Sequence, residues 1–242
     1  MESKVELLKI IVVGIGSRGK AVAAEIGKEC PHVSCVYFQD EKEIADWSEK
    51  QLSEEVMALI VSGMDDENEE AALIRLVTAA KKNKAFTVVI TGAHGNQSTE
   101  IADNSEAVIS CLQSQGVSKN KQHEPLYAAV RGLALIDTPE ARVSLDVSDI
   151  ASVLRGECQF NLGIGSTASI AAKQAINGLS GRNCLLYFLV PEGVSLADIN
   201  EAMTEVQERL GEEANILLGI KETTEKSDFV QVFAYTSCRK QF

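Results

Sequence analysis

The stretch that decides the fold is Leu7-Leu8-Lys9-Ile10-Ile11-Val12-Val13-Gly14-Ile15-Gly16-Ser17-Arg18-Gly19. It opens with a run of apolar and β-branched residues that stops at Gly14, as in a strand buried on both faces of a parallel sheet. The glycines that follow fit the pattern G-x-G-x-x-G, and a helical segment begins at about Arg18. The stretch therefore predicts a strand, a glycine-rich turn and a helix, the order in which Rossmann-like sheets begin.

The same alternation continues along the first half of the chain. Strands are predicted at residues 33–38, 56–61 and 86–91, and helices at 18–28, 41–52 and 69–84. Between Gly92 and Glu124 the pattern predicts one short strand around an apolar island at 107–112, flanked by surface loops. Strands that alternate with helices of this length favour right-handed crossovers and a doubly wound α/β sheet.

The second half begins with a helix whose apolar pattern indicates that it is buried. Pro125 opens it and Ile136 closes it, and proline is favoured in a first helical turn. Helices at about 147–155, 167–179 and 196–210 and strands at 159–164, 184–190, 215–220 and 228–236 follow. We therefore expect an α/β fold in three parts: a Rossmann-like domain at 1–122, a central helix at 123–138 and a second, smaller α/β domain at 139–242.

Composition and charge exclude several classes of function. The chain has 242 residues, of which 45% are hydrophobic and 24% charged, as in an average globular protein. Its 23 Lys and Arg against 35 Asp and Glu give a net charge of −12, which leaves no basic surplus for nucleic acid or for an anionic membrane. No window reaches the ~18 apolar residues of a membrane helix. We expect neither a nucleic-acid partner nor membrane insertion.

Cysteine and histidine usage indicates the compartment and argues against a metal site. The six cysteines form no C-x-x-C pair, and the first residues lack a basic stretch followed by a long apolar one. Both features favour reduced thiols in a cytoplasmic protein. The three histidines, His32, His94 and His123, lie far apart and in no metal-ligand spacing, so no metal site is expected.

The glycine loop is the candidate cofactor-binding site, with Gly14, Gly16, Ser17, Arg18 and Gly19 as its residues. Backbone N–H groups and the positive end of a helix attract phosphate, and an arginine can add a bidentate contact. Asp40 follows Gly19 by 21 residues, the spacing of a carboxylate that binds an NAD ribose. The alternative is a tight turn in which glycine only lets helix and strand pack closely.

A wider comparison indicates a family. Residues 10–19 resemble the first strand and phosphate loop of the FtsZ/tubulin family, and Leu59-Ile60-Val61-Ser62-Gly63-Met64 resembles its F-I-T-A-G-M strand end. Residues 87–91 are similar to its T-V-G-V-V-T strand, 128–134 to its central helix and 144–150 to its synergy loop. Residues 163–166, 184–190 and 215–220 resemble its C-terminal domain, so the resemblance covers nearly the whole chain in order.

One segment departs from the family. Where the family carries the tubulin signature G-G-G-T-G-T-G, this chain has Asp65-Asp66-Glu67-Asn68-Glu69-Glu70. Five carboxylates would repel a triphosphate, whereas they suit the N–H groups and the dipole of a helix that begins here. The protein would then supply its own anion where the family binds one. The alternative is a divalent-cation site formed by Asp65, Asp66 and Glu67. We predict no bound cofactor, and the resemblance keeps GTP or GDP as the alternative.

Asp146 and Asp149 match the two acidic synergy-loop positions that, in the family, activate water against the GTP of the next subunit. The resemblance makes them vestigial catalytic candidates, and no working catalytic residue is predicted. The alternative role is structural, because Asp146 or Ser148 is well placed to cap a short helix that begins near Asp149.

The resemblance implies an FtsZ-like cytoskeletal or cell-division-related protein with a degenerate GTP site, a non-hydrolysing interaction or assembly protein. A head-to-tail contact between two copies would press Asp146 and Asp149 against the acidic segment at 65–70 with no nucleotide between them. FtsZ-type filaments, or self-association in a different arrangement, are therefore the expected partners. The competing hypothesis is a nucleotide- or NAD-dependent enzyme that uses the Gly14–Gly19 loop and Asp40.

Overall fold

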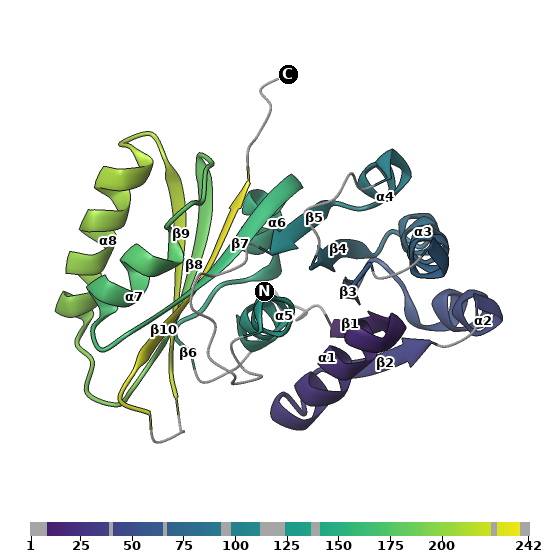
Figure 1. Cartoon of the computed structure of the whole chain (residues 1–242), viewed down its shortest axis with the longest axis horizontal. Helices are drawn as coiled ribbons and strands as arrows, with labels where there is room; N and C mark the ends of the chain where they lie inside the picture. The colour runs from purple at the N-terminus through teal and green to yellow at the C-terminus, as the bar shows by residue number, and fades with distance from the viewer. Residues whose placement is uncertain are drawn as a thin grey trace, which may run out of the picture.

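The computed structural model describes residues 9–38, 41–64, 67–92, 98–111, 124–136, 141–223 and 227–237. Ten strands in these ranges form one sheet in the order β2-β1-β3-β4-β5-β7-β10-β8-β9-β6. Figure 1 shows the N-terminal elements on the right, the C-terminal elements on the left and helix α5 between them. The sheet is continuous because β5 pairs with β7 in parallel, from Ala107 opposite Gly156 to Cys111 opposite Phe160.

The N-terminal half of the sheet is parallel. Its strands are β1 (Lys9–Ile15), β2 (Ser34–Phe38), β3 (Val56–Ser62), β4 (Phe86–Thr91) and β5 (Ala107–Cys111). Every residue of β3 is buried, as the apolar run predicts for a strand covered on both faces. Strand β1 lies between β2 and β3, so the chain first builds outward to one side of β1 and then to the other.

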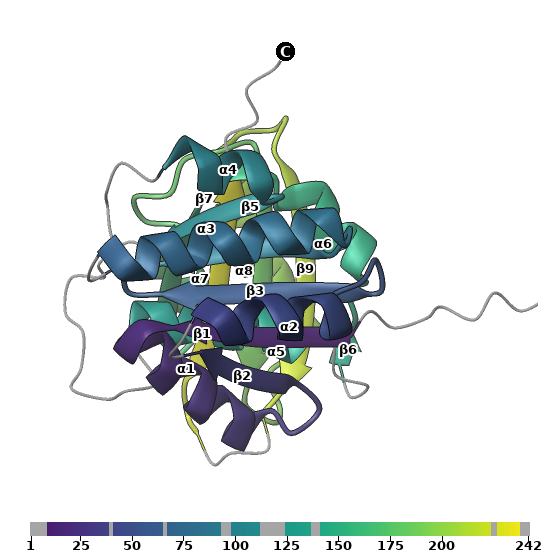
Figure 2. The ribbon, with the colours of Figure 1, turned by 90° about the vertical axis from the view of Figure 1, so that its right-hand side faces the viewer.

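Helices cover both faces of this half. Helix α1 (Gly16–Glu29) packs on one face, where its apolar residues share a core with those of α5 (Pro125–Ile136). Helices α2 (Glu41–Gln51), α3 (Glu67–Lys82) and α4 (Thr99–Asn104) form the layer on the opposite face (Figure 2). The helices that follow β1 and β3 therefore leave on opposite faces, which opens a crevice at the carboxyl ends of these two strands.

The C-terminal half is mixed. It contains β6 (Ala141–Val143), α6 (Val147–Val153), β7 (Gly156–Gly165), α7 (Ala168–Ala175), β8 (Asn183–Val190), α8 (Leu196–Leu210), β9 (Asn215–Glu222) and β10 (Val230–Ser237). Strand β10 is antiparallel to both β7 and β8, and β6 is antiparallel to β9. Helices α7 and α8 share one apolar core with one face of this sheet, while its other face contributes to the core around α5.

Helix α5 is buried along its length from Leu126 to Ile136, which explains why nearly all of its residues are apolar, with Arg131 as the charged exception. Two tyrosines of the C-terminal strands bond to its backbone: the Tyr235 hydroxyl donates to Ala129 O at 2.6 Å and the Tyr187 hydroxyl to Leu135 O at 2.9 Å. A β-carbon on Gly132 would lie 2.3 Å from the Tyr235 hydroxyl oxygen, so glycine permits this close approach.

The predicted fold class is confirmed: an α/β protein with a Rossmann-like parallel sheet, a central helix and a smaller α/β part. Two short elements were not predicted, α4 and β6. Helix α4 has six residues with one buried side chain, Ile101, so it carries no apolar period, and β6 has three residues. The boundaries at 122 and 138 lie outside the described residues and stay a prediction.

The described residues also show the state of the cysteines, the length of the apolar helices and the grouping of metal-binding side chains. The cysteines at positions 30, 35, 111, 158 and 184 are free thiols, and Cys238 lies outside the described residues. In the part of the chain that the structure covers, no helix is both long and apolar enough to cross a membrane. Within that same part, no three His, Cys, Asp or Glu side chains gather in a way that could hold a metal ion.

Candidate functional site

The glycine loop lies at the crevice between β1 and β3, and two of its glycines are required by packing. A β-carbon on Gly14 would lie 2.4 Å from Gly19 O, and a β-carbon on Gly19 would lie 2.2 Å from Val61 O. Helix α1 therefore starts directly against the backbone of both strands. These two glycines are explained by the close contact of helix and strand, whether or not a ligand binds.

Gly16 has a different role, because it faces a side chain from another helix. Its φ is +70°, in the left-handed region that favours glycine. A β-carbon here would lie 1.8 Å from Oε1 of Glu69, a residue in the first turn of α3. The carboxylate of Glu69 thus lies directly on the glycine loop.

Glu69 is held in this position by strand β3. Its Oε2 accepts a 2.8 Å hydrogen bond from the hydroxyl of Ser62, the last residue of β3. The Ser62 oxygen in turn accepts a 3.0 Å bond from the backbone N–H of Met64, which has a φ of 55°. Glu69 as a whole is only 7% exposed. A buried carboxylate is retained where donors and positive dipoles surround it.

The start of α1 provides such a dipole. Within α1, which is described throughout, no side chain caps the N-terminus and no acidic residue lies in the first turn. The N–H groups at a helix start attract an anion, and this is the feature with which nucleotide-binding folds hold phosphate. Here the carboxylate of Glu69, from α3, lies beside Gly16, the first residue of α1. Among the acidic side chains at 65–70 that the structure describes, Glu69 lies against Gly16.

The alternative cation site, formed by Asp65, Asp66 and Glu67, stays a prediction. Asp65 and Asp66 lie outside the described residues, and the side chain of Glu67 is likewise not described. Asp40, the candidate ribose ligand of the NAD hypothesis, also lies outside them. Ser17 is described and is an exposed residue in the first turn of α1.

Arg18 pairs with the carboxylate of Glu124, which was not among the residues predicted for the site. Its Nη2 lies 2.8 Å from Oε1 of Glu124, and the two side chains are 44% and 37% exposed. The other oxygen of Glu124 accepts a 2.8 Å bond from the backbone N–H of Tyr127, so this carboxylate also caps the start of α5. An acidic residue directly before Pro125 was the available signal for such a cap. A β-carbon on Gly92, after β4, would lie 3.1 Å from Nη2 of Arg18.

Asp146 and Asp149 form a capping box at the start of α6. Asp149 N donates to Oδ1 of Asp146 at 2.8 Å, and Asp146 N donates to Oδ2 of Asp149 at 3.2 Å. The structural role that the sequence offered as an alternative is therefore present. Leu145, just before the cap, is close to Gly219 of β9: a β-carbon on Gly219 would lie 3.0 Å from its Cδ1 atom.

The structure does not bring the two acidic candidates to the glycine loop. Helix α6 directly precedes β7, whose first residue Gly156 pairs with Ala107, the first residue of the parallel strand β5. The capping box therefore lies toward the amino ends of the parallel strands, and the glycine loop lies at the carboxyl ends of β1 and β3 (Figure 2). Within one molecule they belong to opposite edges of the sheet.

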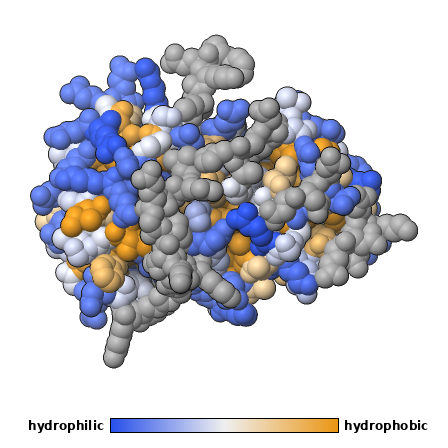
Figure 3. Space-filling model, in the orientation of Figure 1, coloured by the Kyte–Doolittle hydropathy of each residue, from blue (hydrophilic) through white to orange (hydrophobic). Residues whose placement is uncertain are grey.

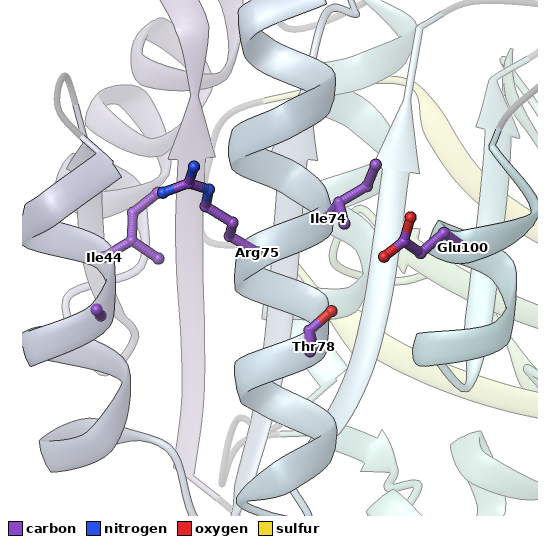
Figure 4. A pocket seen from close by; sticks show the side chains of 6 residues that line it. Ile44, Ile74, Arg75, Thr78 and Glu100 are labelled. Carbon is purple, nitrogen blue, oxygen red and sulfur yellow. The ribbon is translucent and has the colours of Figure 1, made fainter.

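Two surface features lie away from both regions. A groove with a volume of about 330 Å³ runs over the layer of α2, α3 and α4 (Figure 4). Its lining mixes apolar and charged side chains: Ile44, Ala45, Ile74, Arg75, Thr78 and Glu100. On the C-terminal half, on the left in Figure 3, apolar patches lie among hydrophilic residues. Ile170 on α7 and Leu196 on α8 are 52% and 50% exposed.

Sequence comparisons find similarity over part of the chain. No protein-family model matches it. It is 32% identical over 104 residues to cell division protein FtsZ 2 of Thermococcus kodakarensis, covering 38% of this chain and 25% of that protein. It is 30% identical over 102 residues to cell division protein FtsZ 2 of Pyrococcus furiosus, again covering 25% of that protein. The matched region thus spans about a quarter of the length of these relatives.

Structural comparisons cover almost the whole chain. An FtsZ dimer from M. jannaschii matches with a TM-score of 0.78 and 16% identity, over 95% of this chain and 88% of that one. CetZ2 from Haloferax volcanii, in a GTPγS-bound protofilament, matches with a TM-score of 0.64 and 12% identity, over 95% of this chain and 93% of that one. The resemblance that the motifs indicate is confirmed, and the protein is FtsZ-like in fold.

Proposed function

From the FtsZ/tubulin-like fold of this chain, we propose that it is a cytoplasmic cytoskeletal or cell-division-type protein that interacts or assembles without hydrolysing GTP in a site of its own. The observation that carries the proposal is the carboxylate of Glu69 against Gly16, in the crevice where a phosphate would meet the glycine loop. The proposal is that a nucleotide site has become an internally neutralised contact between α1 and α3.

Electrostatics supports this assignment. Two unit charges 4 Å apart repel by about 1 kcal/mol in water and about 4 kcal/mol at the effective dielectric of a protein surface. A triphosphate at the loop would bring several negative charges toward Glu69, which is 7% exposed and poorly screened by solvent. The nearby Arg18 offers little relief, because Glu124 already pairs with it at 2.8 Å.

Under this proposal, the edge of the molecule at the glycine loop and the opposite edge at α6 are suited to different contacts. The glycine-loop edge carries Glu69 in place of an exchangeable anion, whereas the α6 edge presents the exposed Asp146. Two of the similar structures are assemblies, an FtsZ dimer and a CetZ2 protofilament. We propose that the α6 edge of this chain contacts the nucleotide-loaded edge of an FtsZ-type subunit, and that contact between two copies in that arrangement is weak.

Calorimetry tests the nucleotide half of the proposal. The full chain is titrated with GTP, GDP and NAD, with and without Mg²⁺, and no binding heat is expected for any of them. Micromolar binding of GTP or GDP would contradict the proposal and would mean that Glu69 leaves the loop. Binding of NAD would favour the competing enzyme hypothesis, and an Asp40→Ala variant should then weaken it.

Sedimentation tests the interaction half. Filaments of FtsZ 2 from Thermococcus kodakarensis are formed with GTP and pelleted with and without the chain. We expect the chain to pellet with the filaments or to change their mass, and we expect Asp146→Asn to reduce this effect. The absence of both co-pelleting and mass change would contradict filament binding. Sedimentation equilibrium of the chain alone then measures self-association.

A further inference from the structure

A buried arginine joins three elements at the centre of the molecule. Arg131, in the middle of α5, is 3% exposed. Its Nε donates to Oε1 of Glu29, the last residue of α1, and its Nη1 donates to Oε1 of Gln231 on β10 at 2.9 Å. Tyr127, one turn earlier on α5, donates its hydroxyl to the other oxygen of Glu29. We call these four residues the Arg131 cluster.

The surroundings of the cluster are largely dry. The guanidinium carbon of Arg131 lies 5.8 Å from the centre of the Phe233 ring, and the Glu29 side chain is 22% exposed. Burial, with the adjacent Glu29 as a smaller cause, raises the pKa of the Cys30 thiol to about 11. Burial and the hydrogen bond to Glu29 also raise the pKa of Tyr127, so its hydroxyl keeps its proton and remains a donor.

A buried ion pair contributes little net stability, because desolvation offsets the attraction between its charges. Its geometry is nevertheless restrictive, since displacing either partner leaves a buried charge unpaired. In this chain the restriction acts across the fold: Glu29 belongs to the N-terminal half, Arg131 to the central helix and Gln231 to the C-terminal sheet. These contacts join residues 102 and 100 positions apart in the sequence.

Helix α1 extends this connection to the glycine loop. It begins at Gly16, against the carboxylate of Glu69, and ends at Glu29, against Arg131. One continuous helix therefore contacts α3 at its first residue, through Glu69, and α5 at its last residue, through Glu29. A rigid element of this kind can carry coupling between distant residues, provided that the coupling is measured.

We propose that Arg131 is a three-way clamp that fixes α5 against both α1 and β10, so that Glu29 and Gln231 are energetically coupled through its guanidinium. The clamp makes the N-terminal half, the central helix and the C-terminal sheet one cooperative body. It uses side chains of the chain itself and requires no ligand in the glycine loop.

A double-mutant cycle on the full chain tests the clamp. The changes are Glu29→Gln and Gln231→Leu, alone and together, and the measured quantity is the unfolding equilibrium constant from urea denaturation. We expect the two fold-changes to be non-additive, with the double variant departing from their product by at least about 3-fold. The same cycle with Arg131→Met in the background should be additive.

A matched control uses an ion pair within the C-terminal half. Arg182 pairs with Glu213 at 3.3 Å on the surface, and Arg182→Met combined with Glu29→Gln should be additive. Additivity of Glu29→Gln and Gln231→Leu in the presence of Arg131 would overturn the proposal. This cycle needs no variant at Arg131, so it decides the matter even where Arg131→Met fails to fold.

Hydrogen exchange distinguishes loss of the clamp from a general loss of stability, because it measures the opening of each element separately. In Arg131→Met, we expect amides of α5 and β10 to exchange at least about 10-fold faster through a partial opening, while amides of β3 keep the rate set by global unfolding. An equal acceleration of all three elements would mean that the variant lowers global stability alone, and would contradict the clamp.

Discussion

Oε1 of Glu69 lies 1.8 Å from the position that a β-carbon on Gly16 would occupy. The two residues are 53 positions apart in the sequence and come from helices on opposite faces of the sheet. The positive φ of Gly16 favours glycine, and the absence of a β-carbon leaves room for the end of the Glu69 side chain. A residue of the glycine pattern thus makes an intramolecular contact with the acidic segment.

The first prediction concerns Gly16→Ala. The alanine methyl group would overlap the Glu69 carboxylate, and the left-handed backbone adds about 1–2 kcal/mol of strain. Moving the end of the Glu69 side chain away weakens its hydrogen bond from Ser62 and adds about 0.5–1.5 kcal/mol, so urea denaturation should show a loss of about 1.5–3.5 kcal/mol.

Gly193→Ala is the matched control for this prediction. Gly193 has a φ of +91°, and no atom lies within 4 Å of its virtual β-carbon, so the control measures backbone strain alone. The combination Gly16→Ala with Glu69→Ala should lose less stability than the sum of the two single changes, because the overlap is removed. Equal losses for Gly16→Ala and Gly193→Ala would contradict the prediction, because they would show that displacing the Glu69 carboxylate costs nothing.

The second prediction concerns the charge of Glu69. Glu69→Gln keeps an oxygen that can accept from the Ser62 hydroxyl but removes the negative charge beside the start of α1. We expect a loss of about 0.5–2 kcal/mol, the usual contribution of a partly buried charge at a helix terminus. Thermal unfolding measures it, and Glu70→Gln, one position along the same helix, is the control with a smaller expected loss.

The sequence predicted the elements whose patterns are long and locally complete. The run before Gly14 and the largely apolar helix after Pro125 determine buried elements through their own residues, so both were predicted correctly. Helix α4 was missed because its six residues bury one side chain, Ile101, and a pattern needs more than one turn to be visible.

The site could be predicted only in part. An acidic segment at the start of a helix was inferable from charge and from the position of α3, but the contact between Glu69 and Gly16 exists only because the fold brings them together. The Arg131 cluster was invisible for the same reason, since its partners lie 100 or more positions away. The capping box of Asp146 and Asp149 was inferable, because its two residues are three positions apart.

The third prediction is a pH dependence at the start of α8. Asp198 accepts from the Ser195 hydroxyl at 2.7 Å and from Ser195 N at 3.1 Å, and these two bonds lower the pKa of its carboxyl. A carboxyl with a lowered pKa stabilises the folded state above its ordinary range, and this contribution is lost as the pH falls through the folded-state value.

Ser195→Ala should therefore raise the pKa of Asp198 toward its ordinary value, which a carboxyl titration by NMR measures directly. Thr204→Ala is the control, because the Thr204 hydroxyl donates to Asn200 O in the same helix and does not contact Asp198 in the described structure. An unchanged Asp198 titration in Ser195→Ala would contradict the assignment of the shift to Ser195.

The fourth prediction separates the structural role of Asp146 from its charge. Asparagine caps helices as well as aspartate, so Asp146→Asn should keep α6 and leave the free energy of unfolding within about 0.5 kcal/mol of the wild type. Asp146→Ala removes the acceptor of the 2.8 Å bond from Asp149 N and should cost about 1 kcal/mol. Urea denaturation gives both values, and hydrogen exchange of the α6 amides localises the change.

The same pair of variants then separates capping from contact with a partner in the filament sedimentation experiment. If the Asp146 carboxylate meets a partner directly, Asp146→Asn weakens co-pelleting although its stability is unchanged, because only the charge is lost. If Asp146 acts through the cap alone, Asp146→Asn pellets like the wild type and only Asp146→Ala is impaired. The second result would confine this residue to holding the start of α6 and would exclude a direct role for its charge at the interface.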